Sequence, residues 1–259
     1  MKVVLFCGGM GTRLREQSGT IPKPLVPVGE RPIMWHMMKF YAHHGHTDFI
    51  LCLGYKGEMI KEYFLDYKAY RGAEFVTKNK GKVTVPNDSD VDDWNITFVQ
   101  TGLHSNIGQR LLAVKHLLKD EEIFMANYSD QLSDVDLSEY LRLFEQRKDA
   151  VAGIVGVRPS QSFHNVRIND SGNVTKIEPV AVSDFWINGG YIVMRNEIFD
   201  YIKDGEELVE EPFQRLISEK RLFAYKYKGF WAAMDTFKDK ITFDRMDGQG
   251  DRPWQVWDK

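Results

Sequence analysis

A short apolar run followed directly by glycines constrains the fold more than any other part of the sequence. Val3 to Cys7 is an unbroken apolar stretch, and Gly8-Gly9-Met10-Gly11-Thr12-Arg13 follows it without a spacer. A buried strand that feeds a glycine-rich turn is how α/β proteins place backbone N–H groups at the carboxyl end of a strand. Glycines let the backbone approach an anion closely, and successive N–H groups form an anion-binding concavity. The opening therefore predicts an α/β fold with a phosphate-binding turn after its first strand.

The next residues add positive charge to this turn. Residues 21–29 read Ile-Pro-Lys-Pro-Leu-Val-Pro-Val-Gly, with Lys23 third. Because Arg13 and Lys23 can both pair with phosphate oxygens, residues 1–29 predict a cradle for a nucleoside triphosphate. A tight β–α turn with an incidental Arg and Lys is the alternative interpretation. The glycine spacing fits neither the G-x-G-x-x-G of dinucleotide-binding folds nor the G-x-x-x-x-G-K-[ST] of P-loops, which argues against an NAD-dependent oxidoreductase.

Composition excludes several classes of protein. A chain of 259 residues can form one large α/β domain, and its net charge of −3 gives no electrostatic reason to bind nucleic acid or a membrane surface. The N-terminus lacks a signal-peptide pattern, and no stretch approaches the roughly 18 apolar residues of a membrane span. Cys7 and Cys52 lie inside apolar runs and are expected to be reduced structural thiols. These features predict a cytoplasmic protein.

Segments with strand and helix periodicity alternate along the first 157 residues. This alternation implies parallel crossovers, and so a Rossmann-like, doubly wound mixed sheet flanked by helices. Residues 70–93 break the rhythm and are expected to form an inserted ribbon or loop, and residues 160–195 a smaller β-rich part. The whole chain, 1–259, is expected to be a single domain. Expected strands include 49–53, 95–100, 122–126, 150–157, 163–168, 174–178, 191–194 and 223–227, and expected helices include 32–45, 58–67, 109–118, 137–147, 197–202, 212–219 and 237–246.

Two aspartates at the ends of β-like segments are candidate metal ligands. Asp130 follows the strand expected at 122–126, and Asp235 ends the segment that begins at Trp231. Although a single Asp after a strand is usually a turn or helix-cap residue, the pair together with the glycine turn favours a role in chemistry. Mg²⁺ typically takes one or two carboxylates plus phosphate oxygens and water. The combination predicts nucleotidyl transfer, which needs alignment and charge neutralisation more than other help from the protein.

The opening stretch resembles the signature of sugar-phosphate nucleotidyltransferases, G-G-x-G-T-R-L followed by P-K-P-L-V-P-V-G. The resemblance extends over nearly the whole chain and is nearest to the glucose-1-phosphate cytidylyltransferase branch. The matching motifs are P-I-x-W-H at 32–36, G-Y-K-G at 54–57, I-K-E-Y-F at 60–64, W-N-x-T at 94–97, I-N-G-G at 187–190, G-F-W-x-x-M-D-T at 229–236 and P-W-x-x-W at 253–257.

This resemblance implies a Mg²⁺-dependent enzyme that joins CTP to a phosphorylated small molecule and releases pyrophosphate. It implies catalytic roles for Arg13, Lys23, Asp130 and Asp235, with the two aspartates as the metal ligands. It also implies a homo-oligomer, for which the aromatic segment 254–257 is a candidate interface. The residues expected at the nucleotide are Phe6, Gly8, Gly9, Gly11, Thr12, Arg13, Lys23, Thr101, Gly102, Arg110 and Ser129, and those expected at the acceptor are His164, Asn165, Lys176, Glu178, Asn188 and Gly189.

The chain departs from the family pattern at four places. T-G-G-R reads Ile-Gly-Gln-Arg at 107–110, and Y-G-D-G reads Tyr-Ser-Asp-Gln at 128–131. On the acceptor side, R-F-G-A reads Ser-Phe-His-Asn at 162–165, and E-K-P reads Ile-Glu-Pro at 177–179. A carboxylate at 178, where relatives have a lysine, is expected to repel an acceptor phosphate unless Lys176, two residues away, offsets it.

These departures leave two questions open. The first question is the identity of the substrates: the acceptor can be glucose 1-phosphate, another sugar phosphate, a non-sugar phosphate or a phosphonate, and the assignment of cytosine as the base rests on the resemblance alone. The second question is whether the chain is a nucleotide-sensing relative that has lost catalysis.

Overall fold

The computed structural model describes residues 1–9, 20–65, 76–78, 82–84, 91, 93–159 and 163–258. Gly11, Thr12 and Arg13, which the sequence places in the nucleotide cradle, lie outside the described residues, as does Ser162.

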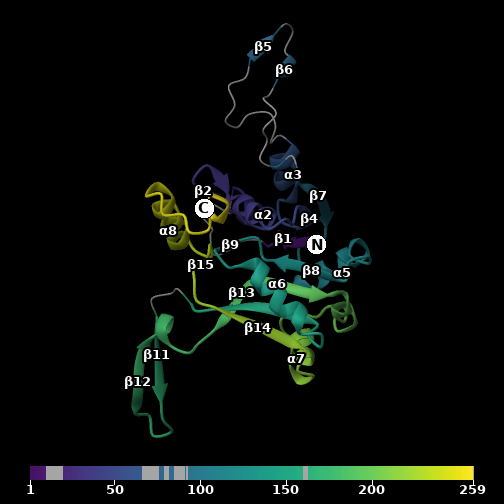
Figure 1. The fold of residues 1–259 in the computed structure, drawn as a ribbon. Helices are drawn as coiled ribbons and strands as arrows, with labels where there is room; N and C mark the ends of the chain where they lie inside the picture. Colours follow the sequence, from purple (N-terminus) through teal and green to yellow (C-terminus); the bar gives the residue numbers. More distant parts are fainter. Residues whose placement is uncertain are drawn as a thin grey trace.

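A seven-stranded mixed sheet forms the centre of the molecule, in the order β14-β10-β13-β8-β1-β4-β7 (Figure 1). All neighbouring strands run parallel except β13, which is antiparallel to both β10 and β8. The carboxyl ends of the other six strands therefore lie at one edge of the sheet. The strands are β1 (Lys2–Phe6), β4 (Asp48–Leu53), β7 (Asn95–Gln100), β8 (Ile123–Asn127), β10 (Ala152–Val157), β13 (Ile187–Arg195) and β14 (Leu222–Tyr227).

Helices cover both faces of this sheet. Val3 and Leu5 of β1 belong to one hydrophobic cluster, which also contains residues of α2, whereas Val4 and Phe6 belong to a second cluster with residues of α5. Alternate side chains of a strand that is buried on both faces must divide in this way. The predicted α/β, doubly wound mixed sheet is confirmed. The helices are α2 (Ile33–His43), α3 (Gly57–Leu65), α5 (Ile107–Val114), α6 (Leu137–Gln146), α7 (Glu211–Ser218) and α8 (Phe237–Gly248).

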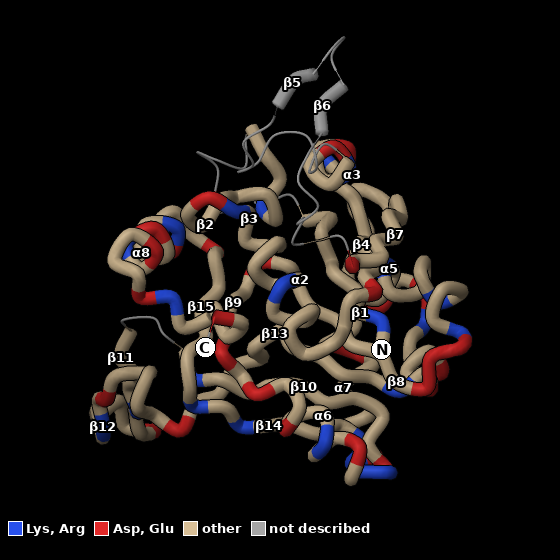
Figure 2. Tube along the Cα trace, turned by 45° about the horizontal axis from the view of Figure 1, so that its top comes forward, with Lys and Arg blue, Asp and Glu red and all other residues tan. Residues whose placement is uncertain are grey.

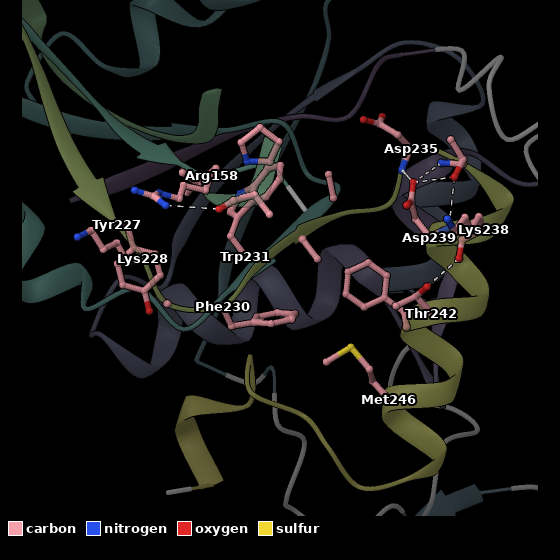
Figure 3. A pocket seen from close by; sticks show the side chains of 18 of the residues that line it. Arg158, Tyr227, Lys228, Phe230, Trp231, Asp235, Lys238, Asp239, Thr242 and Met246 are labelled. Atoms are coloured by element: carbon pink, nitrogen blue, oxygen red, sulfur yellow. Dashed lines mark hydrogen bonds between the residues drawn. The ribbon is translucent and has the colours of Figure 1, made fainter. Parts of the chain in front are cut away.

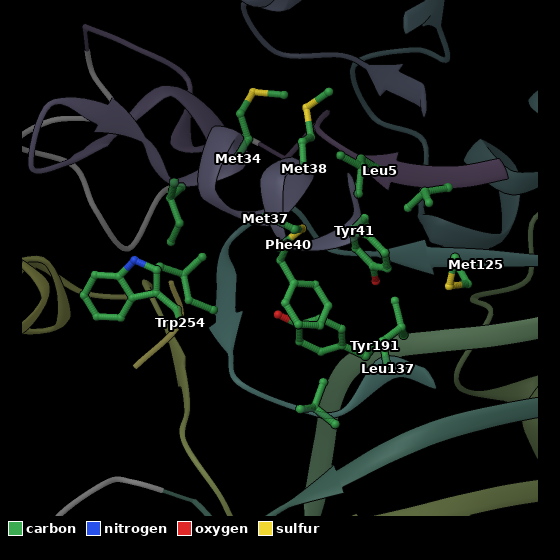
Figure 4. Packing of buried hydrophobic residues seen from close by; sticks show 14 of the residues in the cluster. Leu5, Met34, Met37, Met38, Phe40, Tyr41, Met125, Leu137, Tyr191 and Trp254 are labelled. Atoms are coloured by element: carbon green, nitrogen blue, oxygen red, sulfur yellow. The ribbon is translucent and has the colours of Figure 1, made fainter. Parts of the chain in front are cut away.

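The methionines of α2 fill the core beneath the sheet. Met34, Met37 and Met38 are fully buried. Figure 4 shows the side chains of Met34 and Met38 on the side of the helix away from Phe40, and Met37 beside Phe40, whose ring lies 5.5 Å from that of Tyr191 on β13. Flexible thioethers suit irregular spaces in a hydrophobic core, so these methionines are a packing feature.

Small two-stranded units lie outside the central sheet. The hairpin of β11 (His164–Ile168) and β12 (Val174–Pro179) extends from the body (Figure 1) and corresponds to the strands expected there. Within the stretch expected to be inserted, β5 (Val76–Lys78) pairs with β6 (Lys82–Thr84). Two further pairs matter for the site, namely β2 (Pro27–Val28) with β3 (Arg31–Pro32), and β9 (Gln131–Ser133) with β15 (Trp231–Ala233).

Two expectations differ from the structure. The helix expected at 197–202 is a short 3₁₀ turn, η5 (Asn196–Asp200). The smaller β-rich part expected at 160–195 is divided, because the β11–β12 hairpin lies outside the central sheet whereas β13 is one of its strands.

The aromatic segment 254–257 packs partly inside its own chain. Trp254 is 1% exposed and meets the ring of Phe243 at 5.5 Å, and Trp257 meets Trp35 at 6.0 Å. Residues 255–257 are partly exposed, and the interface expected at this segment stays a prediction.

The two cysteines are neighbours: Cys7 directly follows β1, and Cys52 lies on the adjacent strand β4. Cys7 and Cys52 are free thiols, both fully buried, and the backbone N–H of Cys7 donates to the Cys52 carbonyl at 3.0 Å. Burial raises the pKa of Cys7 to about 12 and also raises the pKa of Cys52. They behave as small apolar core residues, as their sequence context predicts.

Basic and acidic residues are interspersed along the chain in Figure 2, in keeping with the net charge of −3. No helix within the described ranges has both the length and the apolar character that crossing a membrane requires.

Candidate active site

The ends of β1 and β8 meet at the carboxyl edge of the sheet. Leu5 of β1 pairs with Asn127 of β8, so Gly8 and Ser129 follow neighbouring strands. The Ser129 hydroxyl donates to the Phe6 carbonyl at 2.9 Å and ties these ends together. Ser129 has φ of 65°, a left-handed conformation that serine rarely adopts. Open α/β sheets bind their ligands outside this edge, and backbone strain is often found at such sites.

Three charged side chains from distant parts of the chain converge beside Ser129. The Nζ atom of Lys23 lies 2.5 Å from Oδ2 of Asp130 and 2.7 Å from Oδ1 of Asp235. Lys23 opens the 3₁₀ turn η2 (Lys23–Leu25), whose flanking prolines restrict its backbone. The pairing of β9 with β15 brings the two aspartates together, because the Met234 N–H donates to the Asp130 carbonyl at 2.9 Å.

The electrostatics of this triad follow from its burial. The side chains of Lys23 and Asp130 are 14% and 15% exposed, and that of Asp235 is 38% exposed. Burial raises the pKa of Asp130, the Asp235 carboxylate raises it further, and the Lys23 ammonium opposes both. Burial alone would lower the pKa of Lys23, but the two carboxylates outweigh it and raise that pKa. Two carboxylates thus share one ammonium.

The triad fits a divalent cation bound together with phosphates. Oδ1 of Asp130 is buried and has no hydrogen-bond partner, so one carboxylate oxygen is available as a ligand. Across the described ranges, no cluster of three or more His, Cys, Asp or Glu side chains has a metal-binding arrangement. A metal at the two aspartates would therefore complete its shell with substrate oxygens and water, as Mg²⁺ does in nucleotide sites.

A buried guanidinium lies behind the glycine turn. Arg110 is 3% exposed and donates to the Thr101 hydroxyl at 2.7 Å and to the carbonyls of Gly8 and Leu53, both at 3.2 Å. Burial lowers the pKa of Arg110, but guanidinium remains charged at neutral pH. These oxygens belong to neutral hydroxyl and carbonyl groups, so they bind the Arg110 guanidinium without neutralising its charge. That positive charge lies next to the predicted phosphate-binding turn. A Cβ atom on Gly8 would collide with the guanidinium.

The departure at position 109 has a structural explanation. Helix α5 begins with a capping box in which the Asn106 side chain accepts from the Gln109 N–H at 2.8 Å, and the Gln109 side chain accepts from the Asn106 N–H at 3.1 Å. Gln109 thus stabilises the start of the helix that carries Arg110. Gly102, the remaining residue expected near Arg110, has φ of 99° in the loop after β7.

The two acceptor candidates on β13 lie at the same edge of the sheet. The Asn188 side chain donates to the Tyr128 hydroxyl at 3.3 Å, and Tyr128 directly precedes Ser129. The Gly189 carbonyl accepts from the indole of Trp231 at 2.8 Å. Sequence reasoning missed Tyr128 as a contact of the acceptor candidate Asn188, although its position one residue after a buried strand was a usable signal.

The other four acceptor candidates lie on the β11–β12 hairpin. Asn165 is opposite Glu178, and His164 is opposite Pro179. Lys176 forms an ion pair with Glu178 at 2.7 Å, with the two side chains 50% and 16% exposed. Lys176 thus neutralises the reversed charge at 178, as the sequence analysis allowed for. Among the described residues, no hydrogen bond or ion pair joins these four side chains to the Lys23 triad.

A cavity of about 790 Å³ borders the triad at Asp235 (Figure 3). Arg158, Lys228, Trp231 and Thr242 are among its lining residues. Sequence reasoning missed Arg158 and Lys228. Both directly follow strands of the central sheet, and a polar residue in that position is the signal that could have found them.

Comparisons with known proteins identify the family of this chain. The family model described as "Nucleotidyl transferase" matches residues 2–243. A probable glucose-1-phosphate cytidylyltransferase of Bacillus subtilis is 39% identical over 99% of this chain and 100% of its own length. The glucose-1-phosphate cytidylyltransferase of Salmonella typhimurium is 35% identical over the full length of both chains.

Solved structures share the fold at low sequence identity. A candidate glucose-1-phosphate thymidylyltransferase from Bacillus anthracis, in complex with sucrose, is 16% identical with a TM-score of 0.67, covering 95% of this chain and 94% of its own. HddC from Yersinia pseudotuberculosis is 21% identical with a TM-score of 0.61, covering 95% of this chain and 99% of its own.

Proposed function

Because the chain belongs to the nucleotidyl transferase family, we propose that it transfers the cytidylyl group of CTP to a sugar 1-phosphate in a Mg²⁺-dependent reaction. The observation that carries this proposal is the Lys23 ammonium between Asp130 and Asp235. Two full-length relatives named as glucose-1-phosphate cytidylyltransferases support the choice of CTP and of a sugar 1-phosphate. We also propose that the protein is cytoplasmic and assembles as a homo-oligomer.

The proposed reaction is a displacement at phosphorus. An oxygen of the acceptor phosphate forms a bond to the α-phosphorus of CTP, the bond from that phosphorus to the bridging oxygen breaks, and pyrophosphate leaves with the electron pair. No covalent enzyme intermediate is needed. The chain's contribution is alignment and the neutralisation of charge that develops in the transition state.

Nucleotide binding is assigned to the turn after β1. Gly8 and Gly9 let the backbone approach the phosphates, and Arg110 provides a fixed positive charge behind that turn. Gly11, Thr12 and Arg13 remain predictions from the sequence in this role. Ser129 holds the end of β8 against β1, which fixes the position of the adjacent Asp130.

The charged triad is assigned to catalysis. The Lys23 ammonium neutralises charge on the phosphates of the substrates, and its two carboxylate partners hold it in position. Asp130 and Asp235 would hold Mg²⁺, which supplies additional positive charge at the α-phosphate when bound. Asn188, beside Tyr128, is assigned to the acceptor.

The alternative is a nucleotide-binding protein without catalysis. A protein that only senses nucleotide has no need of two carboxylates and a lysine brought together from three distant segments. The departures on the hairpin are the motive for this alternative, and the Lys176–Glu178 pair weakens it by neutralising the reversed charge.

The test measures pyrophosphate release from CTP, Mg²⁺ and a panel of sugar 1-phosphates, with ATP, GTP, UTP and dTTP as competing nucleotides. Release that depends on both CTP and an acceptor is the expected result. Tight CTP binding without release from any pair, in a protein whose circular dichroism is that of the folded state, would favour the binding-only alternative.

A further inference from the structure

The cavity beside Asp235 lies at the binding edge of the sheet. Arg158 directly follows β10, and Lys228 directly follows β14. Since β10 and β14 run in the same direction as β1 and β8, these two cations project from the edge that also carries Gly8 and Asp130. A volume of about 790 Å³ is within the usual range for small-molecule sites.

The two ends of this cavity differ. Asp235 of the triad is at one end and Arg158 at the other, with Trp231 and Phe230 between them (Figure 3). Trp231 is also the residue whose indole contacts the Gly189 carbonyl on the acceptor side. A molecule that reacts near Asp235 and extends over these rings therefore ends beside Arg158.

The Arg158 end carries a local excess of positive charge. The guanidinium of Arg158 and the ammonium of Lys226 lie 5.4 Å and 5.1 Å from the centroid of the Trp186 ring, and Lys228 lines the cavity nearby. Asp184 is the acidic group that faces these cations. Its pKa is lowered first by the hydrogen bond from the Trp186 indole and then by Lys226, Arg158 and Lys228. Three cations thus act on one carboxylate.

Most N–H donors of Arg158 have no hydrogen-bond partner among the described residues. Its Nε atom is buried without a hydrogen-bond partner, and one Nη atom donates only to the Ala181 carbonyl, at 3.5 Å. Within the described part of the chain, Arg158 forms no ion pair. Because Nε is buried, an anion in the cavity would accept from the Nη donors, of which only one has a hydrogen-bond partner among the described residues.

From this geometry we infer that the cavity holds the acceptor, and that Arg158 and Lys228 bind a second anionic group at the end of the acceptor remote from its reacting phosphate. This inference rests on the proposed function. The chemical class is a sugar phosphate with a carboxylate or a second phosphate, in place of a hexose phosphate whose only anionic group is the reacting phosphate. Arg158 then determines acceptor specificity.

The test compares three acceptors that differ at one carbon. Glucose 1-phosphate, glucuronic acid 1-phosphate and glucose 1,6-bisphosphate carry a hydroxyl, a carboxylate and a phosphate at the sixth carbon. The wild type is expected to show kcat/KM for at least one of the two acceptors with a second anionic group about 10- to 100-fold above that for glucose 1-phosphate, the range of a charge-assisted hydrogen bond. A preference for glucuronic acid 1-phosphate would identify the second anionic group as a carboxylate, and a preference for glucose 1,6-bisphosphate would identify it as a phosphate.

Arg158→Gln should abolish that preference and leave the KM for CTP unchanged. Lys226→Ala is the matched control, because Lys226 contacts the same indole but does not line the cavity, and it should keep the preference within about threefold. Equal kcat/KM for all three acceptors, or a preference that survives Arg158→Gln, would overturn the inference while leaving cytidylyl transfer intact.

Calorimetry separates this inference from the proposed function. If no acceptor yields pyrophosphate, the proposed function fails, but binding of glucuronic acid 1-phosphate and glucose 1,6-bisphosphate to the whole protein still tests the cavity. Binding of either one that Arg158→Gln weakens about tenfold or more supports the inference, and binding that the substitution leaves unchanged, or no binding of either, contradicts it.

Discussion

The guanidinium of Arg110 occupies the space in which a Cβ atom of Gly8 would stand, and it donates to the Gly8 carbonyl at 3.2 Å. This contact joins helix α5 to the turn after β1 across a separation of 102 residues. Position 8 therefore requires glycine for packing against Arg110, in addition to the close approach of the proposed nucleotide phosphates. The neighbouring Gly9 has no such contact, since a Cβ there would meet nothing within 4 Å.

Gly8→Ala should therefore lower the free energy of unfolding by about 1–3 kcal/mol, the usual cost of overpacking a buried contact. Gly9→Ala serves as the control and should change it by less than about 0.5 kcal/mol. Urea denaturation of both variants without nucleotide makes the comparison. Equal destabilisation would mean that Arg110 moves aside freely.

Lys23→Met should reduce kcat for pyrophosphate release by roughly 10²–10³-fold, since the variant loses the cation that neutralises transition-state charge. The control is Lys119→Met, because Lys119 is exposed and precedes the amino end of β8, whereas Asp130 follows the carboxyl end of that strand. Both variants should retain the circular dichroism of the wild type. A Lys23→Met enzyme with kcat near that of the wild type would remove Lys23 from the mechanism.

Removal of divalent cations with EDTA should abolish turnover, and Mg²⁺ should restore it. Asp235→Asn should raise the Mg²⁺ concentration needed for half-maximal rate by about tenfold or more, because one of the two proposed carboxylate ligands loses its charge. Asp120→Asn, at an exposed position, is the matched control. An unchanged Mg²⁺ dependence in Asp235→Asn would argue that the metal binds elsewhere.

Ser129→Gly should be more stable than Ser129→Ala by about 1 kcal/mol. Both variants lose the hydrogen bond to the Phe6 carbonyl, but only glycine adopts φ of 65° without a steric penalty. Thermal and urea unfolding of the pair isolate the backbone term. The opposite order would show that the left-handed conformation is not retained.

His36 should make the protein lose stability as the pH falls below neutral. Burial lowers the pKa of His36 from 6.5 to about 4, and its Nε2 atom contacts the Val28 carbonyl at 3.0 Å. The unfolded chain therefore takes up a proton near pH 6.5, whereas the folded protein does so only near pH 4. The contribution of neutral His36 to stability is therefore fully present above pH 6.5 and is lost as the pH falls from 6.5 to about 4.

Because of His36, the free energy of unfolding should be about 2 kcal/mol lower at pH 5 than at pH 7. Urea titrations at the two pH values measure the loss, and His36→Gln, which cannot titrate, should show a pH dependence smaller by that amount. A variant with the same slope as the wild type would contradict this assignment.

Local patterns were sufficient to predict most of the architecture. The run before Gly8 had to be a strand because it is apolar and ends in glycines, and the alternation that followed required crossovers and a doubly wound sheet. Residue spacing could not predict that Lys23, Asp130 and Asp235 meet, because tertiary pairing of β9 with β15 brings them together. That expectation came from resemblance to a family.

Other parts of the site depend on contacts that have no local signature. Arg110 is one of many helical arginines in sequence, and only the fold reveals that neutral oxygens surround it. Lys176 offsets Glu178 because alternate residues of β12 share a face, which the sequence suggested but could not establish. Arg158 belongs to no sequence motif, and it becomes a candidate for binding only because it lines the cavity.

The two buried thiols give this protein an internal reporter of opening. Cys7 is adjacent to Gly8 in the chain and both thiols are fully buried with raised pKa values, so a thiol reagent reaches them only when this part of the fold opens. The rate of labelling in native buffer therefore measures openings near the edge of the sheet that we propose binds the nucleotide. A bound nucleotide that holds this edge closed can be followed through that rate without any introduced probe.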